Sequence, residues 1–531
     1  MPFLYRNLEV SPLTEEKSLP SLMAYLVGIP EATLRDFHIV RKGVDARRKP
    51  RIKLIYTVSF MLAEQGELLS RINTIAGLEW QAQRPADVFR PRHTEQRIVI
   101  AGSGPAGLFT ALRLAEYGLS ATIIERGQAV EQRALDVQQF WRDGRLDPES
   151  NVQFGEGGAG TFSDGKLTCR SKDPLVPWIL QRLTDFGAPP EIRYLAKPHI
   201  GTDRLRCVVS AIRHYLLERG FRIRFGCRLS DILVRDGAVS SVIVNEREEL
   251  ACDRLILAVG HSARDTYELL AAKGLPLEQK PFAMGLRVEH PQELIDRIQY
   301  GGARHPNLPV ADYAVTYNNT GTGRSAYSFC MCPGGIVIGG ASEEGGVVTN
   351  GMSGQERNSS FANSALVVNV TTGDFGSADP LAGVRFQRHW EHQAFLAGGG
   401  SYHAPAQNLL TFLKQPGKRN VSSSYRPGIV ATELDSVLPD FIIRTLREGI
   451  PEFGRKMRGF VSAEATLIGI ESRTSAPLRV LRNQQYESIG LRGLYPAGEG
   501  AGYAGGIMSS AVDGVKIADT IAAQLGAETT S

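Results

Sequence analysis

The stretch that decides the fold is RIVIAGSGPAGLFTALRLAEYGLSATIIE, residues 97–125. Its pattern predicts a buried strand over 98–100, a turn with G-x-G-x-x-G spacing over 102–107 and a helix to about residue 117. A second strand, over 121–124, ends in Glu125. A strand, glycine turn, helix and strand closed by an acid predict a dinucleotide site rather than a glycine turn with only a structural role.

The residues of this turn have different expected roles. Gly102 permits the tight turn, Gly104 lets the backbone approach a pyrophosphate, and Gly107 lets the helix pack against the strand. The helix N-terminus offers unpaired N–H groups and a positive dipole end to that pyrophosphate. Glu125 is placed to accept hydrogen bonds from adenosine ribose hydroxyls. The nucleotide contacts predicted here are Gly102, Ser103, Gly104, Pro105, Ala106, Gly107, Glu125 and Arg126.

Length and composition narrow the class of protein. A chain of 531 residues predicts two or three domains, and a net charge of +4 is too small to imply a polyanionic partner for the whole molecule. Six cysteines without a C-x-x-C pair indicate neither a disulfide scaffold nor a zinc framework. No secretory signal and no apolar run of membrane-spanning length are visible. We therefore expect a reduced, cytoplasmic enzyme.

Residues 1 to about 90 precede the glycine turn and predict a separate small α/β domain. The expected elements are a strand near Leu8, helices over 21–27 and 30–36, and strands over 37–41 and 52–61. Between these last strands, RKGVDARRKPRIK (41–53) carries seven basic side chains. A solvated hairpin is the simpler interpretation, and a patch for RNA, a phosphate-bearing substrate or an acidic protein is the alternative. Residues 83–93 are the expected linker.

Two later segments extend the nucleotide fold. The expected elements are a helix over 203–219, strands over 221–225, 229–234, 239–244, 249–252, 254–259 and 493–497, and a helix from Ile507. The helix, strand, meander and strand of the first segment resemble the second half of the FAD domain in the glutathione-reductase-type flavoprotein superfamily. That superfamily usually ends its last strand in an A-T-G-like turn, where this chain has Ala258-Val259-Gly260.

The C-terminal segment resembles the element that closes the FAD site in this superfamily. A strand, Gly-Asp, a loop and a helix form it there, and Glu499 stands in this chain where the Asp normally is. The resemblance implies that the Glu499 carboxylate accepts from ribityl or ribose hydroxyls of a non-covalently bound FAD. The helix that follows would direct its positive end toward N1 and O2 of the reduced flavin.

Further motifs narrow the resemblance to one family. The chain is similar to the bacterial "FAD-dependent dehydrogenase" family, which implies an FAD-bound oxidoreductase without supplying a substrate. The motifs that carry this are VRKGVDARRKPRIKLIYTV (40–58), GEGGAGTFSDGKL (155–167), GLRVEHP (285–291), FCMCPGGIVIGGASEEGGVVTNGMS (329–353), GIESRTSAPLRVLR (469–482) and PAGEGAGYAGGIMSSAVDG (496–514).

Glycine density predicts further ligand contacts. The loop over 154–167 has few large apolar residues, so its backbone can approach a ligand closely. Together with the segments described above, it completes the set of expected FAD contacts. This second group comprises Gly158, Gly160, Ser163, Gly165, Lys166, Leu229, Gly260, Gly498, Glu499, Gly505, Gly506 and Ile507.

The predicted fold class is α/β with three domains. A glutathione-reductase-type FAD-binding Rossmann domain is expected over 94–270 and 471–531, with an inserted α+β substrate domain over 271–470 that caps the flavin. The small N-terminal domain, 1–90, is expected to be ferredoxin-like. A second G-x-G-x-x-G between a strand and a helix is missing, so a reductant or acceptor such as NAD(P)H must reach the flavin through the same cleft as the small-molecule substrate, or through the redox centre of a protein electron partner.

Arg287, Glu289 and His290 are candidate catalytic residues in the inserted domain. They lie in GLRVEHP, which predicts a strand with Arg287 and Glu289 on one face. Arg287 suits a clamp for a substrate carboxylate, and His290 suits proton transfer near neutral pH. The alternative is an exposed or structurally paired cluster.

Arg473 is the fourth catalytic candidate. It lies with Glu471 and Arg479 in a charged stretch ahead of the closing strand. These charges suit an ion pair beneath the flavin and a substrate clamp equally well.

The motif Cys330-Met331-Cys332 permits two interpretations. On a regular strand, C-x-C places both thiols on one face, as a redox dithiol would need. Flavin disulfide reductases typically use C-x-x-x-x-C after the first helix, and nothing similar follows Gly107. We therefore favour buried structural cysteines.

Residues 354–425 are polar and carry His389, His392 and His403. Two of these histidines are three residues apart, but no H-E-x-x-H or carboxylate set completes a metal site. We predict a solvated helix and no metal.

Three functions remain open from the sequence. The first is an FAD-dependent oxidoreductase that moves a hydride between flavin N5 and an organic substrate. The second is an FAD-dependent tRNA-modifying protein that uses 41–53 as its RNA arm. The third is a non-catalytic flavin sensor or assembly factor. We favour the first.

Overall fold

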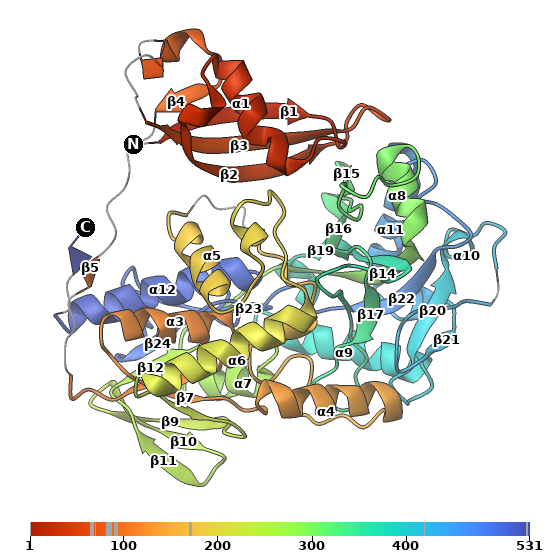
Figure 1. The fold of residues 1–531 in the computed structure, drawn as a ribbon. Helices are drawn as coiled ribbons and strands as arrows, with labels where there is room; N and C mark the ends of the chain where they lie inside the picture. The colour runs from red at the N-terminus through yellow and green to blue at the C-terminus, as the bar shows by residue number, and fades with distance from the viewer. Residues whose placement is uncertain are drawn as a thin grey trace.

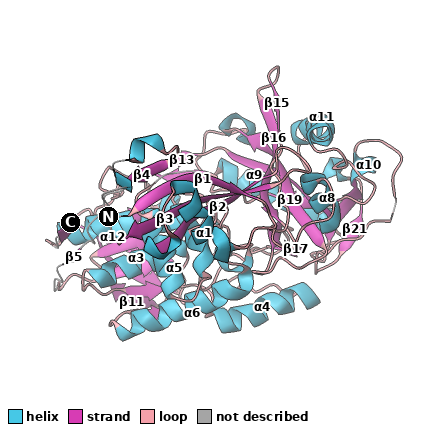
Figure 2. Cartoon of the chain, turned by 45° about the horizontal axis from the view of Figure 1, so that its top comes forward, coloured by secondary structure: helices cyan, strands magenta, loops and turns pink. Residues whose placement is uncertain are grey.

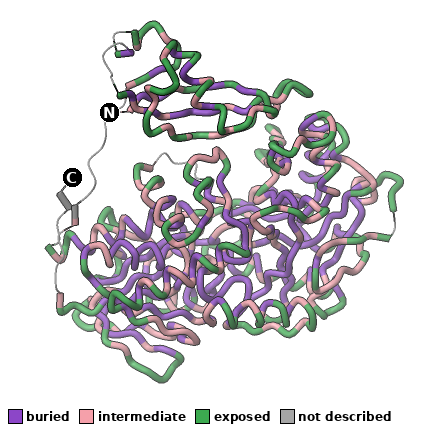
Figure 3. The backbone as a smooth tube through the Cα atoms, viewed as in Figure 1, coloured by how far each residue is buried: buried purple, intermediate pink, exposed green. Residues whose placement is uncertain are grey.

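The structure is a computed structural model, and it describes residues 2–63, 68–69, 71–80, 88–89, 94–168, 173–418, 420–526 and 529–530. Figure 1 shows the N-terminal strands and α1 as a layer above a larger body that contains the other elements. In Figure 3 the buried segments gather inside this larger body, and exposed segments lie along its outer loops. No helix in the described ranges is both long and apolar enough to cross a membrane.

The quoted stretch forms the centre of a five-stranded parallel sheet. The strand order is β24-β12-β6-β7-β8, and every neighbouring pair is parallel. The glycine turn leads from β6 into α3 (Pro105–Glu116), as predicted, and α12 (Ile507–Gln524) packs beside α3. The strands are β6 (Ile98–Ala101), β7 (Thr122–Ile124), β8 (Arg222–Arg224), β12 (Arg254–Leu257) and β24 (Leu494–Pro496).

Alternation along β6 explains why this sheet is covered on both faces. Ile98 and Ile100 join an apolar cluster with α3, α5, α6 and α12, whereas Val99 and Ala101 join a cluster with the meander and α7. Burial on both faces accounts for the continuous apolar run in this strand. The remaining elements are α4 (Val130–Asp143), α5 (Val176–Asp185), α6 (Thr202–Glu218), α7 (Arg264–Ala272), β9 (Leu229–Arg235), β10 (Ala238–Val244) and β11 (Glu248–Ala251).

A seven-stranded sheet forms the core of the inserted segment. Its order is β15-β16-β19-β14-β22-β20-β21, antiparallel except between β20 and β21. Figure 2 shows β15 and β16 projecting at one edge of this sheet. The strands are β14 (Phe282–Pro291), β15 (Thr316–Asn319), β16 (Arg324–Cys332), β19 (Phe361–Val370), β20 (Ala404–Asn408), β21 (Ile429–Ala431) and β22 (Thr466–Glu471).

Two short strands mark where the chain leaves the first sheet for the second and returns. β13 (Leu277–Gln279) and β23 (Leu478–Val480) pair antiparallel although about 200 residues separate them. The pairing brings the two ends of the inserted segment together. The other elements of this segment are α8 (Gln292–Tyr300), α9 (Ala382–Ala397), α10 (Leu409–Phe412), α11 (Asp440–Lys456), β17 (Ile336–Gly339) and β18 (Thr349–Met352).

The N-terminal sheet is antiparallel with the order β2-β3-β1-β4, the order of a ferredoxin-like sheet. The expected helix over 30–36 is wrong. Only Glu31–Thr33 forms a 3₁₀ turn, because β2 starts at Leu34 to pair with Leu62 of β3, and tertiary pairing overrides local preference. The elements are β1 (Phe3–Val10), α1 (Leu19–Val27), β2 (Leu34–Asp45), β3 (Lys53–Leu62) and β4 (Leu78–Trp80).

The basic segment 41–53 comprises the end of β2, the connecting turn and the start of β3, which form the expected hairpin; its alternative role as a binding patch stays a prediction. Several of its cations already have partners: Lys42 pairs with Glu16 at 2.6 Å, and Lys49 Nζ donates to the Ile298 carbonyl at 2.6 Å. Of the expected linker, 83–93, only β5 (Val88–Phe89) is described, and it pairs with β25 (Thr529–Thr530). The other residues of that linker lie outside the described ranges.

Gly107 offers a test of how α3 is seated. A Cβ at this position would lie 2.0 Å from the Gly102 carbonyl oxygen, which is backbone and has no room to move. We expect Gly107→Ala to lower the free energy of unfolding by at least about 2 kcal/mol, measured by urea denaturation.

Gly104→Ala in the same turn is the matched control. The Cβ of this variant would lie 3.7 Å from its nearest neighbour, the Gly158 Cα, so stability should change by less than about 1 kcal/mol. Equal stability of the two variants would contradict the packing role assigned to Gly107.

Candidate active site

A cavity of about 260 Å³ lies where the three predicted nucleotide segments meet. The parallel sheet supplies its walls through the loops that follow the carboxyl ends of its strands, the usual position of a ligand in such folds. Most of the predicted contacts line it. These are Gly102, Gly104, Pro105, Ala106, Glu125, Arg126, Gly158, Gly160, Ser163, Gly165, Lys166, Leu229, Gly260, Glu499, Gly506 and Ile507.

Four predicted contacts do not line the cavity and lie behind it. The Ser103 hydroxyl donates to Glu125, and Gly107 is packed against the Gly102 carbonyl. Gly498 donates its N–H to Asp513 at 2.7 Å, and Gly505 donates to the Ser509 hydroxyl at 2.9 Å. The spacing of a motif does not show which of its residues face a ligand and which only stabilise the loop. These four residues were therefore predicted as ligand contacts although they do not line the cavity.

Two helices begin at the cavity with a glycine as the N-cap residue. Gly104 is the N-cap of α3 and Gly506 is the N-cap of α12, and glycine has no side chain with which to cap the N–H groups of the first turn. A Cβ at Gly506 would meet no protein atom within 4 Å, and one at Gly104 none closer than 3.7 Å. The packing of the protein would therefore tolerate a small side chain at Gly104. A ligand with two anionic groups, such as the pyrophosphate and reduced flavin of FAD, fits these two helix ends.

Glu125 is buried and already carries four hydrogen bonds. One carboxylate oxygen accepts from the Ser103 N–H and hydroxyl, both at 2.8 Å, and the other from the N–H groups of Gly127 and Gly155 at 3.0 Å. It therefore ties the glycine turn to the loop over 154–167. The expected contact with ribose hydroxyls stays a prediction.

Glu499 holds the loop ahead of α12. Its carboxylate accepts from the Gly506 N–H at 3.1 Å. Burial raises the pKa of Glu499 to about 7, against the opposing effects of that hydrogen bond and of nearby Lys280. Its charge therefore changes close to neutral pH.

The candidates of GLRVEHP do not reach the cavity wall. Arg287 makes two hydrogen bonds to Glu471, at 2.8 and 3.0 Å, and Glu289 accepts from the Ser424 N–H at 2.9 Å. His290 lies within hydrogen-bonding distance of the Phe460 carbonyl, 2.8 Å from its Nε2. All three are buried, and their polar groups contact other residues of the protein except His290 Nδ1, which has no hydrogen-bond partner in the described part of the chain. The expected contact of these three residues with substrate is therefore not supported by the structure. Glu471, the ion-pair partner of Arg287, lines the cavity instead.

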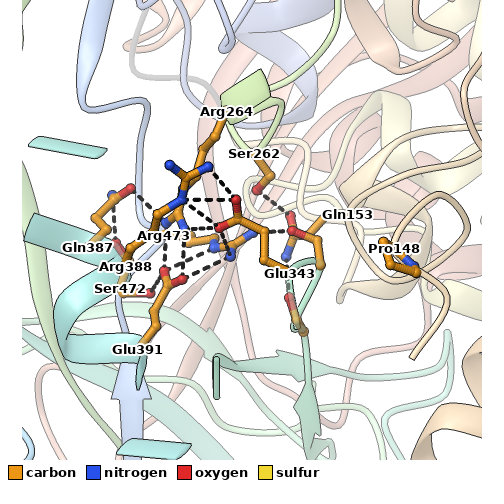
Figure 4. A network of polar contacts seen from close by, with 12 residues as sticks. Pro148, Gln153, Ser262, Arg264, Glu343, Gln387, Arg388, Glu391, Ser472 and Arg473 are labelled. Carbon is orange, nitrogen blue, oxygen red and sulfur yellow. Dashed lines mark hydrogen bonds and ion pairs between the residues drawn. The ribbon is translucent and has the colours of Figure 1, made fainter. Parts of the chain in front are cut away.

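Arg473 lines the cavity, but its charge is bound by carboxylates. It donates to both oxygens of Glu391, at 3.0 and 2.9 Å, and Arg264 binds the same carboxylate at 2.8 and 2.9 Å. Figure 4 shows this buried ion cluster, which Glu343 and Arg388 extend toward the surface. Of the two interpretations offered for Arg473, the ion pair is the one that the structure favours.

The buried ion cluster also joins two parts of the chain. Arg264 opens α7 beside the parallel sheet, whereas Glu391 lies on α9 of the inserted segment. Both side chains are at most 2% exposed, and the two arginines hold the pKa of Glu391 well below its usual range despite its burial. The cluster fixes the inserted segment over the cavity.

Several wall residues were absent from the predicted set. His261 and Asn350 line the cavity, as do Glu471 and Cys330. Burial, with Arg473 and Arg264 nearby, lowers the pKa of His261 to about 4, so it is neutral at neutral pH. In the sequence, only the glycine run before Asn350 and the turn after Gly260 could have indicated that Asn350 and His261 line the cavity.

The strand that carries Cys330 is irregular. Its register against β19 slips between Phe329 and Cys332, and Cys330 adopts the left-handed region at φ 45°. The regular strand assumed for C-x-C is therefore wrong here. Cys332 is fully buried, whereas Cys330 reaches the cavity.

The histidines of 354–425 contact backbone and hydroxyl groups. His392 Nδ1 lies 2.9 Å from the Gly345 carbonyl, and His403 Nδ1 lies 2.7 Å from the Ser401 hydroxyl. His389 lies on α9. In the described part of the chain, no group of three or more His, Cys, Asp or Glu side chains is arranged to hold a metal ion.

Removing the shared carboxylate of the ion cluster tests its role. We expect Glu391→Gln to lower the free energy of unfolding by about 3–5 kcal/mol, because Arg264 and Arg473 would stay buried without their counter-charge. Glu268→Gln is the control, since Glu268 is 47% exposed and bonds only Arg388 of the cluster. Its cost should stay below about 1 kcal/mol in the same urea titration. Equal effects would show that the cluster does not fix the inserted segment.

Comparison with known proteins supports FAD binding by this chain. Residues 95–139 match an FAD binding domain, and 281–474 match the family "FAD-dependent protein, C-terminal domain-like". Residues 4–61 match a domain of unknown function. An "Uncharacterized protein" of Clostridium beijerinckii is 47% identical over 489 residues, which is 91% of each chain.

Solved flavoprotein structures are similar at a lower level. The flavin-dependent brominase Bmp2 covers 82% of this chain with 80% of its own, at 13% identity and a TM-score of 0.38. Glycine oxidase from Geobacillus kaustophilus covers 80% with 94% of its own, at 14% identity and a TM-score of 0.35. Neither similarity is strong enough to assign a substrate. The cofactor is FAD, and the chain is an FAD-dependent oxidoreductase that belongs to the family of the Clostridium beijerinckii protein.

Proposed function

We propose that this chain transfers a hydride between N5 of FAD and a small organic substrate in the cavity. The observation that carries the proposal is the pair of helix N-termini, of α3 and α12, that begin with a glycine N-cap at one cavity. In a glutathione-reductase-type arrangement, the pyrophosphate lies at the first and the flavin pyrimidine edge at the second. FAD supplies the two-electron chemistry, and the residues around it orient the substrate and exclude water.

The proposed domain division follows the sheets. The FAD-binding domain comprises 94–270 and 471–531, and the cap domain comprises 271–470. The antiparallel pairing of β13 with β23 at the crossing between these parts supports the division. The buried ion cluster supports a cap held rigidly against the FAD-binding domain.

The wall that would face the flavin is polar. Lys166 comes from the glycine-rich loop and Asn350 from the cap, whereas Glu471 and Arg473 lie where the chain passes from the cap back to the FAD-binding domain. Because the buried ion cluster binds Arg473, Lys166 and Asn350 are the better candidates for direct contact with the substrate. An uncharged or anionic polar substrate suits such a wall.

Gly104 tests the position proposed for the pyrophosphate. Gly104→Val should weaken FAD binding at least tenfold, about 1.4 kcal/mol, because its side chain would occupy the space in front of α3. Gly302→Val is the control, since a Cβ there meets no atom within 4 Å and lies away from the cavity. Flavin retained after gel filtration gives the binding, and circular dichroism shows whether each variant is folded. Unchanged flavin content in folded Gly104→Val would refute the position.

The hydride transfer is tested on the purified holoprotein. We expect visible flavin absorbance that bleaches under anaerobic conditions with NADH, NADPH or a reduced metabolite, and that recovers when an oxidised substrate is added. A protein that holds FAD but is reduced only by one-electron reagents would contradict hydride transfer. A protein that cannot take up FAD would remove the basis of the proposal.

A further inference from the structure

The cap places two cysteines at the α12 end of the cavity. Cys330 lines the cavity together with Glu499, whose carboxylate accepts from the Gly506 N–H ahead of α12. Cys330 and Glu499 are close enough for the sulfur to raise the pKa of the carboxyl, although burial is the main cause. Under the proposed function, this is the end of the cavity that receives the flavin.

The two thiols interact with each other. The Cys332 Sγ lies 3.4 Å from the Cys330 carbonyl oxygen, within hydrogen-bonding reach of its thiol. The register slips before Cys332 and Cys330 has a left-handed backbone, so the two residues do not follow the side-chain alternation of a regular strand. Both are free thiols in the structure.

Backbone around Cys332 is also shaped to admit the sulfur. A Cβ at Gly351 would lie 2.3 Å from Arg287 Nη1 and from Asn363 Oδ1 and 2.9 Å from Cys332 Sγ, and one at Gly335 would lie 2.5 Å from the Met352 carbonyl oxygen and 3.2 Å from Cys332 Cβ. Two neighbouring glycines thus leave space that a larger side chain would take from this thiol.

The charges around the thiols leave one positive charge in excess. Asp164 is shared between Arg357, at 2.6 and 3.0 Å, and Lys166, at 3.1 Å. Arg287 is paired with Glu471. These three cations face two carboxylates, and Lys166 Nζ also lies 3.8 Å from Cys332 Sγ. While Glu499 is protonated, a thiolate on either cysteine would balance this group of charges.

The local pKa values agree with that balance. The hydrogen bond from Cys332 lowers the pKa of the Cys330 thiol well below its usual range, and Lys166 and Arg287 lower it further against the effect of burial. Burial acts against the charge of Lys166, but the two sulfurs and Asp164 raise its pKa above the ordinary value. Cys330, which lines the cavity, is the sulfur that a substrate can reach, and Cys332 is the buried partner behind it.

We propose that Cys330 and Cys332 form a redox-active dithiol that exchanges an electron pair with the bound flavin and with a small-molecule disulfide. This inference rests on the proposed function, because the electron pair passes through FAD. It names the substrate class of that function as a disulfide, which is reduced to two thiols. A reduced nicotinamide nucleotide is the class of hydride donor that would reduce the flavin.

The steps balance in electrons and protons. The Cys330 thiolate attacks one sulfur of the substrate disulfide, and the other substrate sulfur leaves and takes up a proton. Cys332 then loses its proton and attacks the Cys330 sulfur, so that a Cys330–Cys332 bond forms and the second substrate thiol leaves with a proton. The electron pair of the reduced flavin, with one proton for the Cys332 thiol, restores the thiol and the thiolate.

Counting electrons tests the proposal without an activity assay. Holoprotein is oxidised with ferricyanide, desalted and titrated with dithionite under anaerobic conditions. We expect the wild type to take up about four electrons per flavin, and Cys330→Ser or Cys332→Ser about two, because only the flavin remains to be reduced. Cys207→Ser, which alters an exposed cysteine on α6, should behave as the wild type.

A peptide measurement covers the case in which a serine variant fails to fold. Oxidised wild-type holoprotein should yield a peptide with Cys330 and Cys332 linked and resistant to alkylation, and the dithionite-reduced form should alkylate at both. Reduced holoprotein should also recover its flavin absorbance when 2-hydroxyethyl disulfide is added.

The outcomes separate the two proposals. Uptake of about two electrons by the wild type, with both cysteines alkylated after oxidation, would overturn the dithiol while leaving hydride transfer to FAD intact. Loss of FAD binding or of reduction by any hydride donor would instead remove the proposed function itself.

Discussion

The buried carboxylate of Glu391 is the interaction on which the rest of the site depends. It binds Arg264 at the start of α7 and Arg473 next to the cap sheet, with both arginines nearly excluded from solvent. Each partner would be costly to bury alone, so the three are stable only when the cap and the parallel sheet are correctly seated. Because the cavity lies between these two parts, its shape follows from this contact.

Within this arrangement, backbone groups at two helix N-termini determine which ligand the cavity suits. The N-termini of α3 and α12 both open into it, and Gly104 and Gly506 leave space in front of them. The loop over 154–167 is tied to the same turn through Glu125, which accepts from both Ser103 and Gly155. An extended dinucleotide with anionic groups some distance apart suits this arrangement.

Features that short segments encode were predictable from the sequence, whereas contacts between residues far apart in the chain were not. The turn at 102–107, the meander and the start of α12 at Ile507 were predictable because short segments encode them. Arg473 was also found, but its counter-ion Glu391 lies 82 residues earlier in the chain, which no local pattern reveals. Arg287 and His290 were misplaced because a strand pattern does not tell a cavity-facing side chain from one buried within the cap.

The sequence by itself determined an FAD-binding parallel sheet, since glycine spacing, strand runs and the closing acid are local requirements of nucleotide binding. Only the tertiary structure decided which cap residues reach the cavity. The register slip before Cys332 turns Cys330 toward the α12 end, and Lys166 approaches from a loop 166 residues away. Such placement depends on long-range strand pairing and on the balance of buried charges, neither of which a linear pattern contains.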